Sequence, residues 1–423
     1  MTTGDPEQPS QRSRLGNSTR MLSALKYPQF RRFWFGNAAA VGGQQIMWLA
    51  QGVLVYRLTG EAVYIGFVGL ATAAPAILLN LVGGVVADRI DQRKIILTTQ
   101  IVTSAAVGIL ALLVATDQVS VWHVVAVAFV AGCMQAFNNP ARQSIFPGLV
   151  ERKELMNAVA LNSIVWQSMR IVAPGIGGLV LAIFGVAATF SLVCAGFLLL
   201  GVAVIGLDTP AQRRTTKTSP LADLKEGIAF ISANFLFAFL IGMSFFNSFF
   251  GFSTQQLMPV FTEDILHVSD FWLGMLLSMT GVGSIIGIGA LGYAGDVERK
   301  GLLIIGGATA FGAFIILFAL STYYPLSLLL VGFMGAFGSI YMITVQTTLQ
   351  LRVPDELRGR VMGIYGITHN VGPLGALQAG IIADSVSPPA ALIVGGVAII
   401  VFALAIAYSN RSVRTLASAP AAA

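Results

Sequence analysis

The chain is divided into long apolar segments by short polar loops. About 20 apolar residues are enough for a helix to cross the hydrocarbon core of a bilayer. Twelve segments meet this length: 33–56, 63–87, 95–115, 121–142, 157–183, 187–207, 235–261, 271–294, 301–321, 325–350, 361–383 and 390–408. The longest stretch between them is 208–234, so no soluble catalytic domain fits in the remainder. This pattern predicts an all-α membrane protein with twelve transmembrane helices.

The composition excludes the main alternatives to a membrane protein. Hydrophobic residues make up 56% of the chain and charged residues 10%, whereas roughly 25% of an average soluble domain is charged. A soluble fold of 423 residues needs more charge than this to cover its surface. The two cysteines, Cys133 and Cys194, both lie in apolar runs, so they indicate no disulfide framework.

Lysine and arginine indicate how the predicted helices are oriented. Of the 25 Lys and Arg residues, all except Arg57 and Arg170 fall in the two tails and the even-numbered loops. Cytoplasmic loops carry this excess of basic residues. We therefore expect an integral plasma-membrane protein with both termini in the cytoplasm. The net charge of +6 follows from this bias. Because the basic residues are spread over every inner loop, no nucleic-acid partner is expected.

The two halves of the chain carry the same Gly, Asp, Glu and Pro residues at corresponding positions. Three sets of residues recur 208, 202 and 199 positions apart: Gly84 and Asp88 with Gly292 and Asp296, Glu154 with Glu356, and Pro174 with Pro373. Such a repeat predicts two related six-helix units. The expected organisation is a partly disordered tail at 1–32, a bundle at 33–207, a linker at 208–234, a second bundle at 235–408 and a tail at 409–423. Leu221, Leu224, Ile228 and Ile231 predict an amphipathic helix in the linker.

The loop after the second span carries a family resemblance. It reads Gly84-Val85-Val86-Ala87-Asp88-Arg89-Ile90-Asp91-Gln92-Arg93-Lys94 and is similar to the Gly-x-x-x-Asp-Arg-x-Gly-Arg-Arg signature of the major facilitator superfamily. Asp91 replaces the family glycine and Gln92 a basic residue. The loops 147–155 and 353–362 resemble the exporter branch that includes enterobactin exporters and macrolide efflux proteins. The span-five antiporter motif is partly present, since Ala173 replaces the first glycine of Gly-Pro-x-x-Gly-Gly.

The resemblance implies two pseudo-symmetric six-helix bundles around a central cavity, usually in a monomer. Spans 1, 4, 7 and 10 would line the cavity, helped by 2, 5, 8 and 11, with 3, 6, 9 and 12 at the periphery. It also implies a conformational latch, in which Asp88 meets the N-terminal end of span eleven. The latch residues are Gly84, Asp88, Arg89, Arg93, Lys94 and, in the second half, Asp296. The alternative is that these are ordinary turn and topology charges.

Arg170 is the sharpest polar feature of the spans. It lies halfway along span five, where an ionised arginine costs at least about 2.5–3.5 kcal/mol to insert. It shares a helical stripe with Asn162 and Trp166. Such a residue should face a cavity or a partner, so we interpret it as a contact for an anionic or polar substrate group. The alternative is a structural arginine bonded to neighbouring carbonyls and amides.

Other polar residues form single-faced stripes on the expected cavity helices. Amides that only fasten helices together are the alternative. The predicted substrate cavity comprises Asn37, Gln44, Trp48, Gln51, Gln135, Asn138, Asn139, Asn162, Trp166, Arg170, Asn247, Thr254, Gln346 and His369. The phenylalanines of span seven cannot all face one cavity, so each is expected to face lipid or a neighbouring helix. His369 is the candidate proton site, with a neutral packing histidine as its alternative.

All 19 Asp and Glu residues fall in tails, loops or span ends. Embedded carboxylates are the usual proton relays and would attract cations. We therefore expect a neutral to positive cavity that takes neutral or anionic amphipathic molecules. The predicted function is proton-coupled export by alternating access. An importer or facilitator, or a membrane sensor or assembly protein, stays open. No metal-ligand cluster, ATP-binding motif or nucleophile–base pair is present, so no enzyme, cofactor or metal is expected.

Overall fold

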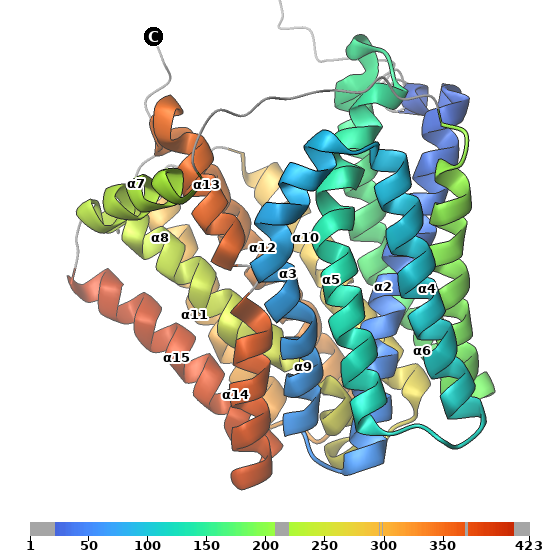
Figure 1. Cartoon of the computed structure of the whole chain (residues 1–423). Helices are drawn as coiled ribbons and strands as arrows, with labels where there is room; N and C mark the ends of the chain where they lie inside the picture. The colour runs from blue at the N-terminus through green and yellow to red at the C-terminus, as the bar shows by residue number, and fades with distance from the viewer. Residues whose placement is uncertain (1–21, 208–219, 296, 298, 369–370, 410–423) are drawn as a thin grey trace, which may run out of the picture.

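The computed structural model describes residues 22–207, 220–295, 297, 299–368 and 371–409. Helices account for nearly all of this part of the chain and run side by side in one large bundle (Figure 1). By length and composition, eight helical stretches in the described residues could span a membrane, and Arg152–Val204 holds two of the predicted spans. The arrangement is the predicted all-α fold of two six-helix bundles.

The first half begins with a 3-10 turn at Leu22–Lys26. Its α-helices are α2 (Pro28–Thr59), α3 (Val63–Arg89), α4 (Gln92–Ala115), α5 (Val121–Ile145) and α6 (Leu155–Val204), with 3-10 turns at Phe146–Leu149 and Arg152–Glu154. The long α6 carries spans five and six. Its backbone leaves the helical region at Gly185, with φ 79° and ψ −178°, a combination that only glycine adopts readily. Gly185 lies in the short gap between the two predicted spans, 157–183 and 187–207.

The second half starts with α7 (Pro220–Ala233), which covers part of the predicted linker and lies against α8 and α13 (Figure 1). The remaining helices are α8 (Phe235–Phe246), α9 (Phe252–Val260), α10 (Asp270–Ala294), α11 (Lys300–Ala319), α12 (Tyr324–Arg352), α13 (Asp355–Thr368), α14 (Gly372–Ser385) and α15 (Pro388–Ser409). Two predicted spans are therefore composite. Span seven contains a π-helical turn at Asn247–Gly251, and a second such turn, Phe261–Ile265, begins at the last residue of the span. Span eleven, expected as one helix, is divided between α13 and α14.

The two halves touch through paired helices. A Cβ atom at Gly66 of α3 would lie 2.4 Å from the Cα of Leu377 in α14. A Cβ atom at Gly178 of α6 would lie 2.8 Å from the Cα of Gly274 in α10. Gly274 follows Gly66 by 208 residues, and Leu377 follows Gly178 by 199. The two contacts are therefore equivalent under the repeat that the sequence indicates, and glycine is needed because backbone meets backbone there.

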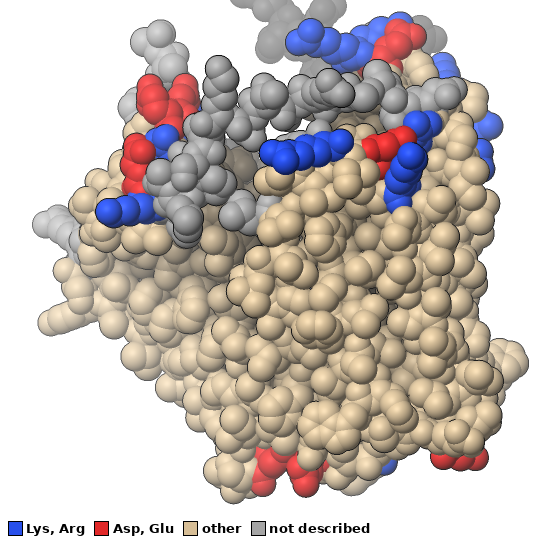
Figure 2. Space-filling model, viewed as in Figure 1, with Lys and Arg blue, Asp and Glu red and all other residues tan. Residues whose placement is uncertain are grey.

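The charges divide the bundle into two ends. Figure 2 shows Lys and Arg, with some Asp and Glu, at the upper end of the view, which we call the basic end, and an uncharged band below it. The opposite end, which we call the acidic end, holds six carboxylates: Glu61, Asp117, Glu263, Asp264, Asp270 and Asp384. Among the described residues, Arg57 is the one Lys or Arg at this end. This distribution is what an embedded band between two aqueous faces requires.

The halves are closed at the acidic end and separate toward the basic end. Gly84 and Gly292 lie about five helical turns beyond Gly66 and Gly274, on the same faces of α3 and α10. A Cβ atom at either Gly84 or Gly292 would meet nothing within 4 Å. The faces that touch the other half near the acidic end therefore contact nothing near the basic end. The structure is a state open toward the basic end.

Candidate substrate cavity

Three cavities of about 360, 320 and 390 Å³ meet in the centre of the molecule, and Phe252 lines all three. Trp48 and Gln256 link the first to the third, while Arg170 and Thr280 link the second to the third. Their walls come from both halves. Together they form one central site, referred to below as the central cavity. A volume of this order suits a drug-sized molecule.

A fourth and much smaller cavity of about 40 Å³ adjoins the central cavity. It shares Gln135 and Asn139 with the first cavity and Trp166 with the third. Arg142 lines it on one side. We call it the side pocket. It is about one eighth to one tenth of the size of each of the three other cavities.

Most of the predicted substrate residues lie at these walls. They are Gln44, Trp48, Gln51, Gln135, Asn138, Asn139, Trp166, Arg170 and Asn247. Sequence periodicity places a residue on a face of its helix, and here the polar faces of α2, α5 and α6 turn inward. Polar residues from both predicted bundles therefore converge on one site.

Other predicted residues lie elsewhere. Asn37 is buried and its Nδ2 donates to Oδ1 of Asn162 at 3.0 Å, so these two amides hold α2 against α6. Thr254 is fully buried and lines none of the four cavities. Gln346 is exposed and outside them as well. Asn37 and Asn162 show that a polar stripe does not separate cavity lining from helix fastening. His369 lies outside the described residues.

Several wall residues are absent from the predicted set. A fourth span that ends at residue 142 makes Arg142 a loop charge, whereas α5 continues to Ile145. The sequence nevertheless places Arg142 on the polar stripe of span four, seven residues after Gln135, and that stripe predicts cavity lining. The expectation that Phe252 faces lipid or another helix is wrong. It lines the whole central cavity and meets Trp48 edge to face, with ring centroids 6.5 Å apart.

The expected division between lining and peripheral spans is not strict. Thr99 and Gln100 of α4, in span three, line the side pocket, and so does Phe197 of span six. Phe311 of α11, in span nine, lines the central cavity. Another span-seven ring behaves as expected, since Phe246 stacks on Phe402 of α15 with centroids 4.2 Å apart.

Arg170 carries the charge of the central cavity. In the described chain its guanidinium makes no hydrogen bond or ion pair, and no Asp or Glu lines any of the four cavities. It lies one helical turn beyond Trp166 on α6, so the two side chains are neighbours. A half-buried cation without a counter-ion attracts an anion or a strong hydrogen-bond acceptor.

Neutral donors add to this wall. The Nε2 of Gln51 and the Oγ1 of Thr280 are buried without a hydrogen-bond partner in the described residues, and both side chains line the central cavity. A buried polar group left unpaired costs about 1–3 kcal/mol. A bound molecule would recover this free energy only if the two side chains turn these buried atoms toward the cavity.

The predicted latch is only partly within the described structure. Arg93 forms a 2.7 Å ion pair with Asp91 and donates to the carbonyl oxygen of Leu207, which fixes the loop to the end of span six. The hydrogen bonds from Arg93 hold the pKa of the Asp91 carboxyl below its usual range. Arg89 and Lys94 are exposed. The side chain of Asp88 and all of Asp296 lie outside the described residues.

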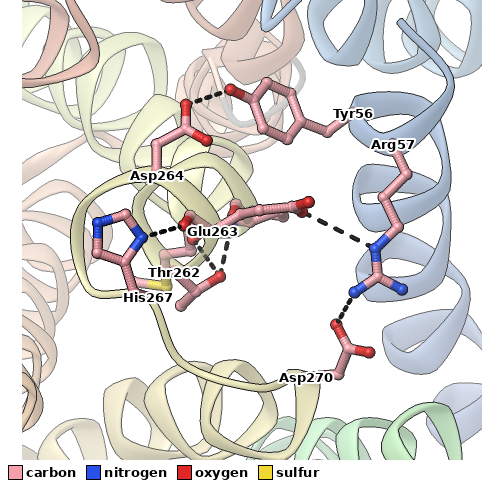
Figure 3. Close-up of polar contacts among 9 residues, drawn as sticks. Tyr56, Arg57, Thr262, Glu263, Asp264, His267 and Asp270 are labelled. Carbon is pink, nitrogen blue, oxygen red and sulfur yellow. Dashed lines mark hydrogen bonds and ion pairs between the residues drawn. The ribbon is translucent and has the colours of Figure 1, made fainter. Parts of the chain in front are cut away.

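Polar contacts between the halves close the acidic end (Figure 3). Arg57 of α2 pairs with Asp270 at 2.8 Å and with Glu263 at 3.8 Å, and the hydroxyl of Tyr56 donates to Asp264. On the other side, the carboxylate of Asp384 accepts from the backbone nitrogens of Ala62 and Val63 at 2.7 and 2.8 Å. These contacts stabilise the state open toward the basic end.

The Arg57 pairs are expected to contribute little. The Arg57 side chain is 43% exposed, and exposed ion pairs are worth about 0.2–1 kcal/mol. We expect Arg57→Gln to raise the population open at the acidic end by no more than about fivefold. The measurement is the rate at which a membrane-impermeant thiol reagent, added at the acidic side, labels Thr72→Cys in a chain lacking Cys133 and Cys194. Glu61→Gln, whose side chain makes none of these contacts, is the control, and a much larger rise for Arg57→Gln would contradict the estimate.

Comparison with known proteins identifies the family. The model of the family described as "Transmembrane secretion effector" matches residues 19–422. The chain belongs to this family. The multidrug efflux pump Tap of Mycolicibacterium fortuitum is 29% identical, over 83% of this chain and 88% of Tap. The enterobactin exporter EntS of Escherichia coli O1:K1 is 25% identical, over 88% of this chain and 92% of EntS.

Solved structures show the same fold. A bacterial homolog of the human lysosomal transporter Spinster, in an inward-facing and unoccupied conformation, matches with a TM-score of 0.72 at 15% identity, covering 94% of this chain and 99% of that one. The nucleoside transporter NupG matches with a TM-score of 0.72 at 12% identity, covering 90% of this chain and 98% of NupG. This transmembrane secretion effector is therefore a membrane transporter of the major facilitator superfamily.

Proposed function

We propose that this transporter exports small amphipathic molecules, neutral or anionic, from the cytoplasm. The observation that carries the proposal is the unpaired Arg170 in a central cavity with no carboxylate among the described residues at its walls. A cavity of this charge disfavours lipophilic cations and favours acceptor groups. The exporter names of Tap and EntS support the direction of transport.

The conformation fits loading from the cytoplasm. The positive-inside rule assigns the basic end, with both termini, to the cytoplasm. The central cavity then opens inward in this structure, and the contacts at Arg57 and Asp384 seal the outer side. Alternating access requires a second state in which the seal is at the basic end. The latch at Gly84 to Lys94 would stabilise that second state. The transporter would work as a monomer.

Energy for export would come from a gradient, because the sequence carries no ATP-binding motif. We propose protons as the coupling ion. His369 is the proposed proton site, since its unperturbed pKa near 6.5 allows it to change charge at physiological pH. No Asp or Glu among the described residues lines the cavity walls, so no carboxylate there offers an alternative proton relay.

The aromatic wall supplies the apolar part of recognition. Phe252 meets every part of the central cavity, and packing an aromatic face against a ligand ring is worth about 0.5–1.5 kcal/mol beyond the area it buries. We expect Phe252→Ala to weaken substrate binding by about tenfold. Phe252→Leu should lose less, because it keeps most of the apolar volume. Equal binding in the three proteins, measured by calorimetry, would remove Phe252 from the site.

Efflux from proteoliposomes tests the function. The panel consists of anionic, neutral and cationic amphiphiles of similar size, each measured with and without an uncoupler. We expect anionic and neutral members to leave in an uncoupler-sensitive manner. Efflux that ignores the uncoupler would point to a facilitator or another driving ion, and preference for the cationic members would overturn the charge argument.

A further inference from the structure

A second arginine lies within reach of the central cavity. Arg142 of α5 is half-buried, and its guanidinium carbon is 6.0 Å from the ring centroid of Trp166. Its Nη2 donates to Oδ1 of Asn37, and Asn37 donates in turn to Asn162. In the described residues no carboxylate pairs with Arg142. The amide chain therefore orients the guanidinium without neutralising its charge.

Trp166 connects the two arginines. Its side chain is 38% exposed and lines both the side pocket, with Arg142, and the central cavity, with Arg170. Arg142 lies over its ring, and Arg170 follows it by one helical turn. A molecule that spans the side pocket and the central cavity along Trp166 would thus meet Arg142 in the first and Arg170 in the second. Two uncompensated cations on one aromatic support are costly unless anions bind there.

The cavity volumes decide which part of a molecule goes where. The side pocket of about 40 Å³ is the smaller space and, with Arg142 in its wall, suits a carboxylate, a sulfonate or a phenolate oxygen. The central cavity beside it, with Trp48 and Phe252, holds a planar body. Gln135 and Asn139 line both spaces, so the two adjoin each other.

From this arrangement we propose that Arg142 forms a second anion subsite, and that the transported substrate is an aromatic molecule with two anionic groups, one at Arg142 and one at Arg170. This inference rests on the proposed function, because it names the substrate class of the same cavity. Asn37 and Asn162 act as positioning residues. The alternative is that Arg142 only ties α5 to α2 through Asn37.

The test measures binding to the full-length purified transporter by calorimetry. The probes are naphthalene-2,6-disulfonate, naphthalene-2-sulfonate and 2-naphthol, which share a ring system and differ in charge. We expect the disulfonate to bind about tenfold more tightly than the monosulfonate, as an added charge-assisted contact implies. Arg142→Met, which keeps an unbranched side chain, should abolish that preference and leave the monosulfonate unchanged. Arg142→Lys should retain part of the preference.

Unchanged monosulfonate binding is also the control for folding. If Arg142→Met weakens all three probes equally while Arg142→Lys does not restore the preference, Arg142 is a structural tie and the subsite is wrong. The subsite is also wrong if the disulfonate is never preferred although the monosulfonate binds through Arg170. Failure of the proposed function looks different: neither sulfonate binds, Arg170→Gln changes nothing, and neither probe is exported.

Discussion

Replacing Arg170 with glutamine should reduce export of anionic substrates by about ten- to a hundredfold, because a hydrogen bond to a charged group contributes about 1.5–3 kcal/mol. Glutamine keeps donors in the central cavity but removes the charge that has no counter-ion in the described chain. Neutral substrates of the same size should lose less than anionic ones. The measurement is initial efflux rate against substrate concentration in proteoliposomes.

Arg170→Lys is the matched variant for this prediction. It keeps the charge but not the planar fork, so it should restore part of the anion transport. Size-exclusion profiles of the purified variants check that the fold survives. If anionic and neutral substrates fall together in Arg170→Gln, and Lys restores neither, then Arg170 holds helices together and does not read substrate charge.

Gly274→Leu should open the acidic end. A Cβ atom at Gly274 would lie 2.4 Å from the carbonyl oxygen of Pro174 in α6, so a leucine forces α6 and α10 apart. Overpacking of this kind costs about 1–3 kcal/mol, which shifts the balance of states about fivefold to more than a hundredfold toward the state open at the acidic end. Transport should fall with it, since the cycle needs both states. Labelling of Thr72→Cys from the acidic side reports the shift.

Two further glycines provide matched variants for this experiment: Gly66, at the equivalent contact in the repeat, and Gly292, on the same face of α10. Gly66→Leu disturbs the equivalent contact of α3 with Leu377 and should give the same increase in labelling. Gly292→Leu adds the same side chain to the same face of α10, at a position where a Cβ atom meets nothing within 4 Å. It should not increase labelling from the acidic side. Equal labelling in all three variants would contradict the idea that the glycine contacts hold this end closed.

Much of the fold could be predicted from the lengths of the apolar segments and the positions of the loops between them. The boundary near Gly185 was predictable, because the apolar run from 157 to 207 is too long for a single span of about 20 residues. The composite form of span seven was not, since a π-helical turn such as Asn247–Gly251 differs from an α-turn by one residue and leaves hydropathy unchanged. The sequence also gives no sign that span eleven is divided between α13 and α14. Pro373 lies near the start of α14, a position that suits proline, but membrane helices tolerate proline in their interior as well.

The site was predictable to the extent that charge is expensive in a membrane. Arg170 is visible in the sequence because nothing else in span five is charged. Arg142 shares the polar stripe of Gln135, but the sequence leaves open whether it lines the cavity or is a loop charge, because helix ends are the least certain feature of a sequence. Amides divide between cavity and packing only in three dimensions, as Asn37 and Gln135 show.

The surplus of carboxylates at the acidic end has a consequence for the release step. Six acids against Arg57 give the acidic end a negative potential. If the acidic end faces outward and the substrate is an anion, as proposed above, a released anion is repelled from this end, so its recapture slows and the export cycle gains a forward bias. The repulsion reaches about 8 Å at physiological ionic strength and shrinks to about 3 Å in 1 M salt. Back-flux of an anionic substrate should therefore grow as external salt is raised.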